Sequence, residues 1–177
     1  MTYALRPTSD APERPELTAG LTARAAIEDL RRRLVRYAVK LLWNRDDAEE
    51  VTQEAFGIAI EHGVTHAESR FGPWMFRTVG NLCLNRRRKR KHEPLDKWIE
   101  HAGEDDPVEK AAQLERLTML REAIEKLPDQ QRIAIVLKTQ QQMDYGDMAH
   151  IMEISESAAR GHVHQARRKL AELMPQE

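Results

Sequence analysis

The sequence predicts an all-α protein with two small helical domains joined by a flexible acidic linker, the C-terminal domain containing a helix-turn-helix. First, Leu, Ala, Arg, Glu and Gln are abundant while Gly and Pro occur only eight times each, a composition that favours helix. Second, apolar residues recur every three or four positions over most of the chain. Third, an acidic stretch with Pro and Gly interrupts that periodicity. We expect a flexible N-terminal tail at 1–22, a first domain at 23–92, a linker at 93–110 and a second domain at 111–174.

The first domain should contain three helices. The tail before it carries Pro7, Pro12 and Pro15 and shows no helical period. The first helix starts near Ala23, and Asn44 follows its end. The second helix carries acidic residues in its N-terminal half, which suit the helix dipole. A loop at 64–71, closed by the Gly72-Pro73 pair, precedes a third helix that starts near Trp74. The apolar residues that define the three inner faces are Ile27, Leu30, Leu34 and Leu41; Ala48, Val51, Ala55 and Ile58; and Met75, Val79 and Leu82.

The linker prediction rests on Pro94, Gly103 and Pro107 among many acids. In the second domain, Pro128 fits the first turn of a helix. Asp144 can cap a short helix at 145–152, and Ser155 can cap the last helix. Apolar spacing marks the inner faces at Leu114, Leu117, Ile124 and Leu127; Ile133, Val136 and Leu137; and Ala159, Val163, Ala166, Leu170 and Leu173.

Charge is unevenly distributed although the formal net charge is only −1. The segments 86–91 and 160–169 are basic, whereas 46–54 and 93–109 are acidic. A polyanion responds to the local field, so two separated basic segments suggest two contacts with one nucleic acid. Cys83 is the only cysteine, which excludes an intrachain disulfide and fits a reducing cytosol. No apolar run approaches the roughly 18 residues of a membrane span, so we expect a cytoplasmic protein without direct membrane insertion.

The last two helices follow the helix-turn-helix plan, in which a short helix and a turn precede a basic second helix. Arg and Gln side chains can bind base edges in the major groove, and Arg also binds phosphate. A solvated cationic helix on a plain bundle is the alternative interpretation. The residues expected to face DNA are Ser157, Arg160, Gly161, His164, Gln165, Arg167 and Arg168.

The third helix of the first domain offers a second candidate DNA surface. Aromatic rings beside amides and arginines suit unstacked single-stranded bases, which stack on rings while their polar edges are bound. The alternative is that Phe71, Trp74 and Phe76 are core residues, and for Phe76 we prefer the core. The candidate residues are Phe71, Trp74, Arg77, Thr78, Asn81, Asn85 and Arg88.

An acidic cluster made of Asp47, Glu49, Glu50 and Glu54 cannot contact DNA favourably. Such a cluster is commonly a solvated face, and its alternative role is docking to a basic protein partner.

These motifs together resemble the sigma-70 family, in its small extracytoplasmic-function (ECF) group. The segment 46–56 (DDAEEVTQEAF) is similar to the helix that binds core RNA polymerase, and 74–82 (WMFRTVGNL) to the helix that opens and reads the promoter −10 element. The segments 127–132, 145–149 and 154–170 resemble the domain that reads the −35 element. The match covers nearly all of 23–173, and the motifs occur in the family's order.

The resemblance implies a transcription initiation factor that binds core RNA polymerase, directs it to promoters and helps melt the −10 region. It assigns polymerase binding to Asp47, Glu50, Gln53 and Glu54, −10 binding to the set from Phe71 to Arg88, and −35 binding to the set from Ser157 to Arg168. It further implies promoter DNA and an anti-sigma factor as partners. It implies neither an enzymatic activity nor a cofactor.

The run 140–142 (QQQ) replaces the family's glycine-containing approach to the helix at 145–152, and two single residues also depart from the family pattern. Glu153 stands where the family often has glycine, in the turn between the last two helices, and predicts a strained or differently shaped turn. Gly161 lies within the expected DNA-reading helix and costs about 1 kcal/mol relative to alanine there.

Two other functions are conceivable from the sequence. A free-standing helix-turn-helix regulator would leave the acidic cluster and the first basic segment without a role. A metal protein or enzyme would need more than His62 and His66, because no nearby Cys, His or Asp completes a site. No phosphate-binding glycine loop or nucleophile-base pair occurs either, so we assign no catalytic residues and no metal ligands.

Overall fold

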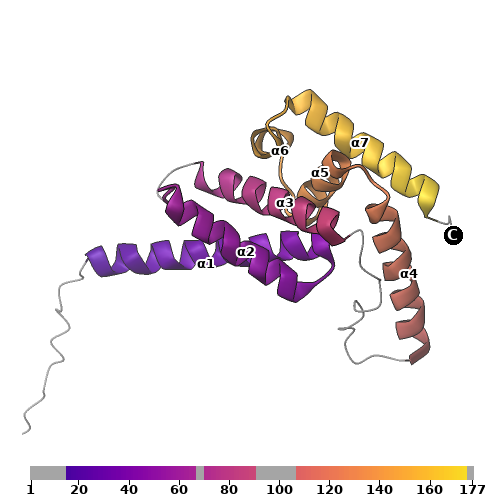
Figure 1. The fold of residues 1–177 in the computed structure, drawn as a ribbon, viewed down its shortest axis with the longest axis horizontal. Helices are drawn as coiled ribbons and strands as arrows, with labels where there is room; N and C mark the ends of the chain where they lie inside the picture. The colour runs from indigo at the N-terminus through magenta and orange to yellow at the C-terminus, as the bar shows by residue number, and fades with distance from the viewer. Residues whose placement is uncertain (1–14, 67–69, 91–106, 175–177) are drawn as a thin grey trace, which may run out of the picture.

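The computed structural model describes residues 15–66, 70–90 and 107–174, and within these ranges the chain is all-α with no strand. This confirms the predicted all-α class. The helices are α1 (Pro15–Leu42), α2 (Arg45–Glu61), α3 (Phe71–Arg90), α4 (Pro107–Glu125), α5 (Asp129–Gln140), α6 (Tyr145–Met152) and α7 (Glu156–Leu173), coloured in chain order in Figure 1.

The start of α1 corrects the expected boundary of the N-terminal tail. The helix begins at Pro15, so residues 15–22 are helical rather than part of the tail. A proline at the start of a helix has a suitable φ and loses no hydrogen bond there, because the first N–H groups of a helix have no intrahelical acceptor. Pro15 therefore begins α1 and does not interrupt a helix. The expected tail at 1–14 lies outside the described residues.

The start of α3 is a second correction. The helix begins at Phe71, so Gly72 and Pro73 belong to its first turn and do not close a preceding loop. Proline is tolerated in a first turn for the same reason as at Pro15. The expected linker at 93–110 is shortened as well, because α4 begins at Pro107, and its remaining part at 93–106 lies outside the described residues.

Three side-chain caps fix helix starts. The Asn44 carboxamide oxygen accepts from the Asp47 N–H at 3.0 Å at the start of α2. The expected caps of α6 and α7 are confirmed: Asp144 accepts from the Asp147 N–H at 2.7 Å, and the Ser155 hydroxyl accepts from the Ala158 N–H at 3.1 Å. Each cap satisfies one backbone donor that the helix itself leaves unpaired.

Arg132 joins α4 to α5 through buried hydrogen bonds. Its guanidinium donates to three backbone carbonyls at the end of α4 and in the following turn, those of Ile124, Glu125 and Leu127. It also pairs with Asp129 at 3.0 Å. Burial lowers the pKa of Arg132, but three carbonyl oxygens and the Asp129 carboxylate accept its hydrogen bonds and compensate for the lost water. This arginine is a structural cation in the α4–α5 corner.

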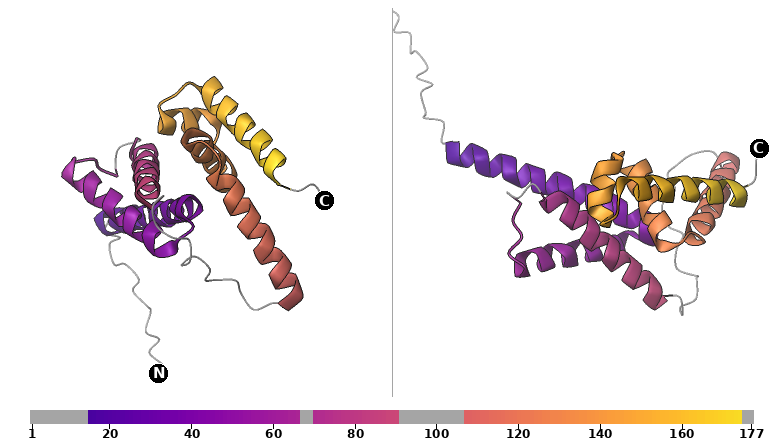
Figure 2. Two further views of the ribbon diagram at one scale, coloured as in Figure 1. Left: turned by 45° about the vertical axis from the view of Figure 1, so that its right-hand side comes forward. Right: turned by 90° about the horizontal axis from the view of Figure 1, so that it is seen from above.

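The helices form two groups that pack directly on each other. We call α1–α3 the N-terminal group and α4–α7 the C-terminal group, and Figures 1 and 2 show the two groups side by side. Contacts run between α1 and α5 and between α3 and α6. One core cluster contains Leu34 and Met75 of the first group together with Leu137 and Met148 of the second. The groups are therefore held by packing as well as by the chain between them.

No helix among the described residues is long and apolar enough to cross a membrane.

Candidate protein and nucleic-acid interfaces

The acidic face of α2 contains three of the four residues expected to bind polymerase. Glu50, Gln53 and Glu54 are exposed on successive turns. Asp47 is only 7% exposed, so its expected place in the exposed cluster is wrong. The helix period explains this: Asp47 lies four residues before Val51 and shares its inward face. The face available to a protein partner is formed by Glu50, Gln53 and Glu54.

Arg86 of α3 connects to this acidic face. Its guanidinium lies 3.3 Å from Asp47 Oδ1 and 2.8 Å from Glu50 Oε2. The hydrogen bond with Glu50 raises the pKa of Arg86. The pairing neutralises a buried carboxylate where α2 and α3 meet, and Arg86 acts within the N-terminal group.

Arg87 is likewise turned inward. Its guanidinium donates to the Leu41 carbonyl at 3.0 Å and lies 3.9 Å from Glu125. Burial is the largest influence on its pKa and lowers it. The expectation that the whole basic segment 86–91 contacts nucleic acid is therefore wrong for Arg86 and Arg87, whose side chains hold helices together. The end of this segment, Lys91, lies outside the described residues.

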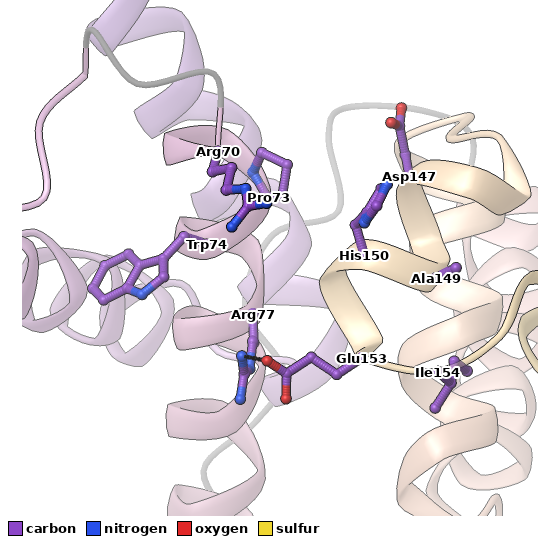
Figure 3. Close-up of a pocket in the computed structure, with 9 residues that line it drawn as sticks. All are labelled: Arg70, Pro73, Trp74, Arg77, Asp147, Ala149, His150, Glu153 and Ile154. Atoms are coloured by element: carbon purple, nitrogen blue, oxygen red, sulfur yellow. Dashed lines mark hydrogen bonds and ion pairs between the residues drawn. The ribbon is translucent and has the colours of Figure 1, made fainter.

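The aromatic part of the candidate −10 surface divides into core and surface. Phe71 is 8% exposed and packs against Phe56 with ring centroids 6.4 Å apart, so its expected stacking on bases is wrong. Phe76 is 2% exposed, as preferred from the sequence. Trp74 is half-buried, and Figure 3 shows its ring on the side of α3 away from α6. Trp74 is thus the aromatic side chain of this set that a base can reach.

The polar part of the same surface faces α5 and α6. Arg77, Asn81, Asn85 and Arg88 are exposed, while the Thr78 hydroxyl donates to the Trp74 carbonyl at 2.9 Å. Arg77 forms an ion pair with Glu153, at the end of α6. Arg88 Nη2 lies 3.0 Å from Asp129 Oδ2 at the start of α5. These two cations are paired with the C-terminal group in this conformation.

A groove of about 750 Å³ lies between the start of α3 and α6. Arg70, Pro73 and Arg77 line it from α3 and the residue before it, opposite His150 and Glu153, as Figure 3 shows. Arg70 is exposed beside Trp74 but was not among the sequence candidates. Its charge next to an aromatic motif was the signal that could have identified it. The roles of Asp129 and Glu153 as acceptors for Arg88 and Arg77 had no such signal, because their partners are distant in the sequence.

The candidate −35 surface is presented by α7. Exposed side chains cover its outer face, while Ala159, Val163 and Ala166 are buried on the inner face. Arg160 lies 4.5 Å above the centre of the Tyr145 ring and pairs with Glu156 at 3.1 Å. The Gln165 carboxamide accepts from Gln131 at 3.1 Å. The structure brings together the whole expected set on one helix: Ser157, Arg160, Gly161, His164, Gln165, Arg167 and Arg168, with only Gly161 partly covered.

The two departures noted in the sequence have different structural outcomes. Glu153 has φ 53° and ψ 45°, the left-handed conformation that favours glycine, and it ends α6. The turn is therefore strained, as predicted. A Cβ at Gly161 would meet no protein atom within 4 Å, so packing within the protein does not require glycine there.

The described residues contain no cluster of three or more His, Cys, Asp or Glu side chains that could hold a metal ion.

Comparisons with known proteins match both helical groups. Residues 26–93 match the model of sigma-70 region 2, and residues 117–170 match that of sigma-70 region 4. The chain is 29% identical to the ECF RNA polymerase sigma factor SigM of Bacillus subtilis (strain 168) over 140 residues, 78% of this chain and 86% of that protein. It is 30% identical to the ECF RNA polymerase sigma factor EcfG of Rhodopseudomonas palustris (strain TIE-1) over 153 residues, 85% of this chain and 81% of that protein.

Among solved structures, the fold is similar to the sigma factor RpoE of Bartonella quintana, crystallised with the anti-sigma factor NepR. The TM-score is 0.64 at 22% identity, over 85% of this chain and 94% of that one. At this identity the likeness concerns the fold.

Proposed function

The chain belongs to the sigma-70 family of RNA polymerase sigma factors, in its ECF group, and on this premise we propose which of its surfaces carries each step of promoter recognition. The function of the chain is to direct RNA polymerase to promoters. Its family consists of initiation factors and is not a family of catalytic enzymes. A free-standing helix-turn-helix regulator is not favoured, because the family matches cover 26–93 as well as 117–170.

The exposed face of α2 is the proposed site for core polymerase. Glu50, Gln53 and Glu54 offer carboxylates and an amide to a basic partner, and charge complementarity of this kind gives specificity and a high rate of association. Asp47 takes part indirectly, by pairing with Arg86, which in turn contacts Glu50.

The proposed promoter contacts are on α3 and α7. On α3, Trp74 is available for stacking on an unpaired base, and Arg77, Asn81, Asn85 and Arg88 for the edges and phosphates of the −10 strand. On α7, which with α6 forms the proposed helix-turn-helix, Arg160, His164 and Gln165 are placed for bases of the −35 element, and Arg167 and Arg168 for phosphates. We also propose a cytoplasmic location and an anti-sigma factor as a further partner, supported by the complex in which the similar RpoE was crystallised.

One observation carries this proposal: a single chain presents an exposed acidic face on α2 and an exposed cationic face on α7. The test is run-off transcription with purified core RNA polymerase on a library of genomic fragments. The full chain should produce discrete transcripts that core polymerase alone does not. The Gln53→Lys/Glu54→Lys double variant should reduce them at least about tenfold, because like charges at an interface cost several kcal/mol.

Glu61→Lys is the control variant, since Glu61 is exposed at the end of the same helix but outside the proposed site. Equal transcript yields from the double variant and from this control would refute the assignment of the α2 face. Absence of any transcript with the unmodified chain would count against the function itself.

A further inference from the structure

The side of α3 that carries Arg77 and Arg88, two of the proposed −10 residues, is packed against the C-terminal group. A Cβ at Gly80 would lie 2.8 Å from Tyr37 Oη and 3.8 Å from Ile133 Cδ1 of α5, so the backbone of α3 lies against side chains of α1 and α5 at this point. A small cavity beside it is lined by Asn81 of α3 and by Ile151 of α6. Promoter DNA cannot occupy the same space as α5 and α6 on this face.

Several polar contacts cross between the two groups in addition to the 3.9 Å ion pair of Arg87 with Glu125. Glu153 accepts from Arg77, and Asp129 accepts from Arg88 at 3.0 Å. The Gln141 side chain binds Arg33 twice: it accepts from Nε at 3.3 Å and donates to the backbone carbonyl at 3.3 Å. The contacts of Arg77 and Arg88 thus occupy arginines of the proposed −10 surface with carboxylates of the C-terminal group.

Glu153 is an unfavourable residue for its own turn. Its φ of 53° lies in the left-handed region, which glycine adopts freely and residues with a Cβ do not. The side chain contributes nothing to the cap of α6, because the capping N–H belongs to the backbone and bonds the Ala149 carbonyl. What the carboxylate contributes is the ion pair with Arg77 across the two groups, visible in Figure 3.

The polar contacts between the groups are individually weak, so the two groups can separate. The Arg77 and Glu153 side chains are 42% and 59% exposed, and exposed ion pairs are individually weak and sensitive to salt. The Tyr37 hydroxyl is buried at the same interface and, among the described residues, has no hydrogen-bond partner. A buried hydroxyl without a partner disfavours the closed arrangement relative to one that admits water.

We propose that Glu153 is an autoinhibitory latch. In the free chain its carboxylate holds Arg77 and keeps α6 over the −10 face of α3; separation of the two groups releases Arg77 and Arg88 for the DNA strand. This rests on the proposed −10 function of α3. DNA phosphates compete with Glu153 for the same guanidinium, so binding of the −10 strand and opening of the groups favour each other.

The test compares the full chain with Glu153→Gln, Glu153→Gly and the control Glu156→Gln. Glu156 is 58% exposed, close to the 59% of Glu153, but its ion pair with Arg160 stays within α7. Glu153→Gln and Glu156→Gln each remove one carboxylate and release one arginine. Only the two Glu153 variants, which we call the latch variants, remove a contact between the groups.

Spin labels at Glu61→Cys and Ala171→Cys, one exposed site in each group, report the separation by pulsed electron–electron resonance, with buried Cys83 left in place. Glu153→Gln and Glu153→Gly should raise the ratio of open to closed molecules by about 1.5- to 5-fold, the range expected for an exposed ion pair. The affinity of the free chain for the single non-template strand of a promoter found by run-off transcription should rise by the same factor. Glu156→Gln should change neither.

Thermal unfolding separates a latch from a merely structural role. Glycine relieves the left-handed turn and glutamine does not, so Glu153→Gly should melt at a higher temperature than Glu153→Gln although both open the molecule. If the distance distribution and the strand affinity of both variants equal those of Glu156→Gln, the latch is refuted. That result is distinct from failure of the proposed function, which would appear as absence of transcription with the unmodified chain.

Discussion

The basic helices α3 and α7 have similar charge in the sequence but use it differently. On α3, Arg86 pairs with Asp47 and Glu50, Arg87 bonds a carbonyl of α1, and Arg88 pairs with Asp129. On α7, the ion pairs of Arg160 and Arg168 are with residues four positions away on the same helix. The cations of α3 therefore hold helices together, and those of α7 remain on an open face.

The difference follows from where each helix lies. Helix α3 is central and contacts α1, α2 and α6, whereas α7 lies at the edge and contacts α4, α5 and α6 with its inner face only (Figure 1). A cation on a central helix meets carboxylates from several neighbours, while a cation on an edge helix meets water. The count of basic residues in a segment says how much charge is present, and packing decides how much of it DNA can reach.

The largest expected effect is on the free energy of unfolding, and it compares an arginine of α3 with an arginine of α7. Arg86→Ala should lower the free energy of unfolding by about 2 to 3 kcal/mol, because it leaves the buried Asp47 carboxylate without this partner. Arg167→Ala, on the exposed face of α7, should change it by less than about 0.5 kcal/mol. Urea unfolding of the full chain followed by circular dichroism measures both.

Arg86→Lys should recover part of the loss, since a lysine keeps the charge but lacks the rigid guanidinium that places Nη1 against both carboxylates. Equal stability of Arg86→Ala and Arg167→Ala would break the comparison, because it would mean that the pairs of α3 contribute no more than those of an exposed helix.

The pH dependence of stability tests the inner face of α3. Burial raises the pKa of the Cys83 thiol of α3, and the nearby arginines lower it only in part. The folded state thus keeps the proton at pH values where the unfolded thiol, with a pKa of about 8.5, has lost it. The stabilisation is complete below about pH 8.5 and is lost as pH rises, by about 1.4 kcal/mol per pH unit from this one group.

Urea unfolding at several values between about pH 8 and 10 should show this slope in the full chain. Cys83→Ala should show a slope smaller by the contribution of one proton, whatever its absolute stability. Identical slopes for the two proteins would mean that the Cys83 thiol ionises in the folded state as readily as in the unfolded one. Burial also raises the pKa of Tyr37, which adds a loss of the same sign above about pH 10.

The smallest expected effect concerns DNA affinity. Arg167→Ala should weaken binding of polymerase holoenzyme to promoter DNA by about 1 kcal/mol or less and reduce the slope of log affinity against log salt by about 0.9, one phosphate contact. Arg86→Ala should leave that slope unchanged when measured on the folded fraction. Fluorescence anisotropy over a salt series gives both slopes, and a reduced slope for Arg86→Ala would show that this residue reaches DNA after all.

The sequence by itself determined the elements and the family. Apolar spacing and the capping residues Asp144 and Ser155 act over a few positions, so they can be read without knowing the fold. The same is true of the outer face of α7, because a regular helix with one buried stripe exposes its other side. The expected boundaries at Pro15 and Pro73 are wrong, because proline breaks a helix in its interior but is accepted in its first turn.

Only the tertiary structure decided which charged and aromatic residues are available. Arg132 and Arg167 are both arginines on amphipathic helices, yet Arg132 is 5% exposed and binds carbonyls of the preceding corner. Asp47 and Phe71 looked like surface residues and are buried, and Arg77 meets Glu153 from 76 positions away. The physical reason is distance in the chain: local patterns fix helices through contacts three or four residues apart, whereas pairing and burial depend on neighbours that folding alone brings together.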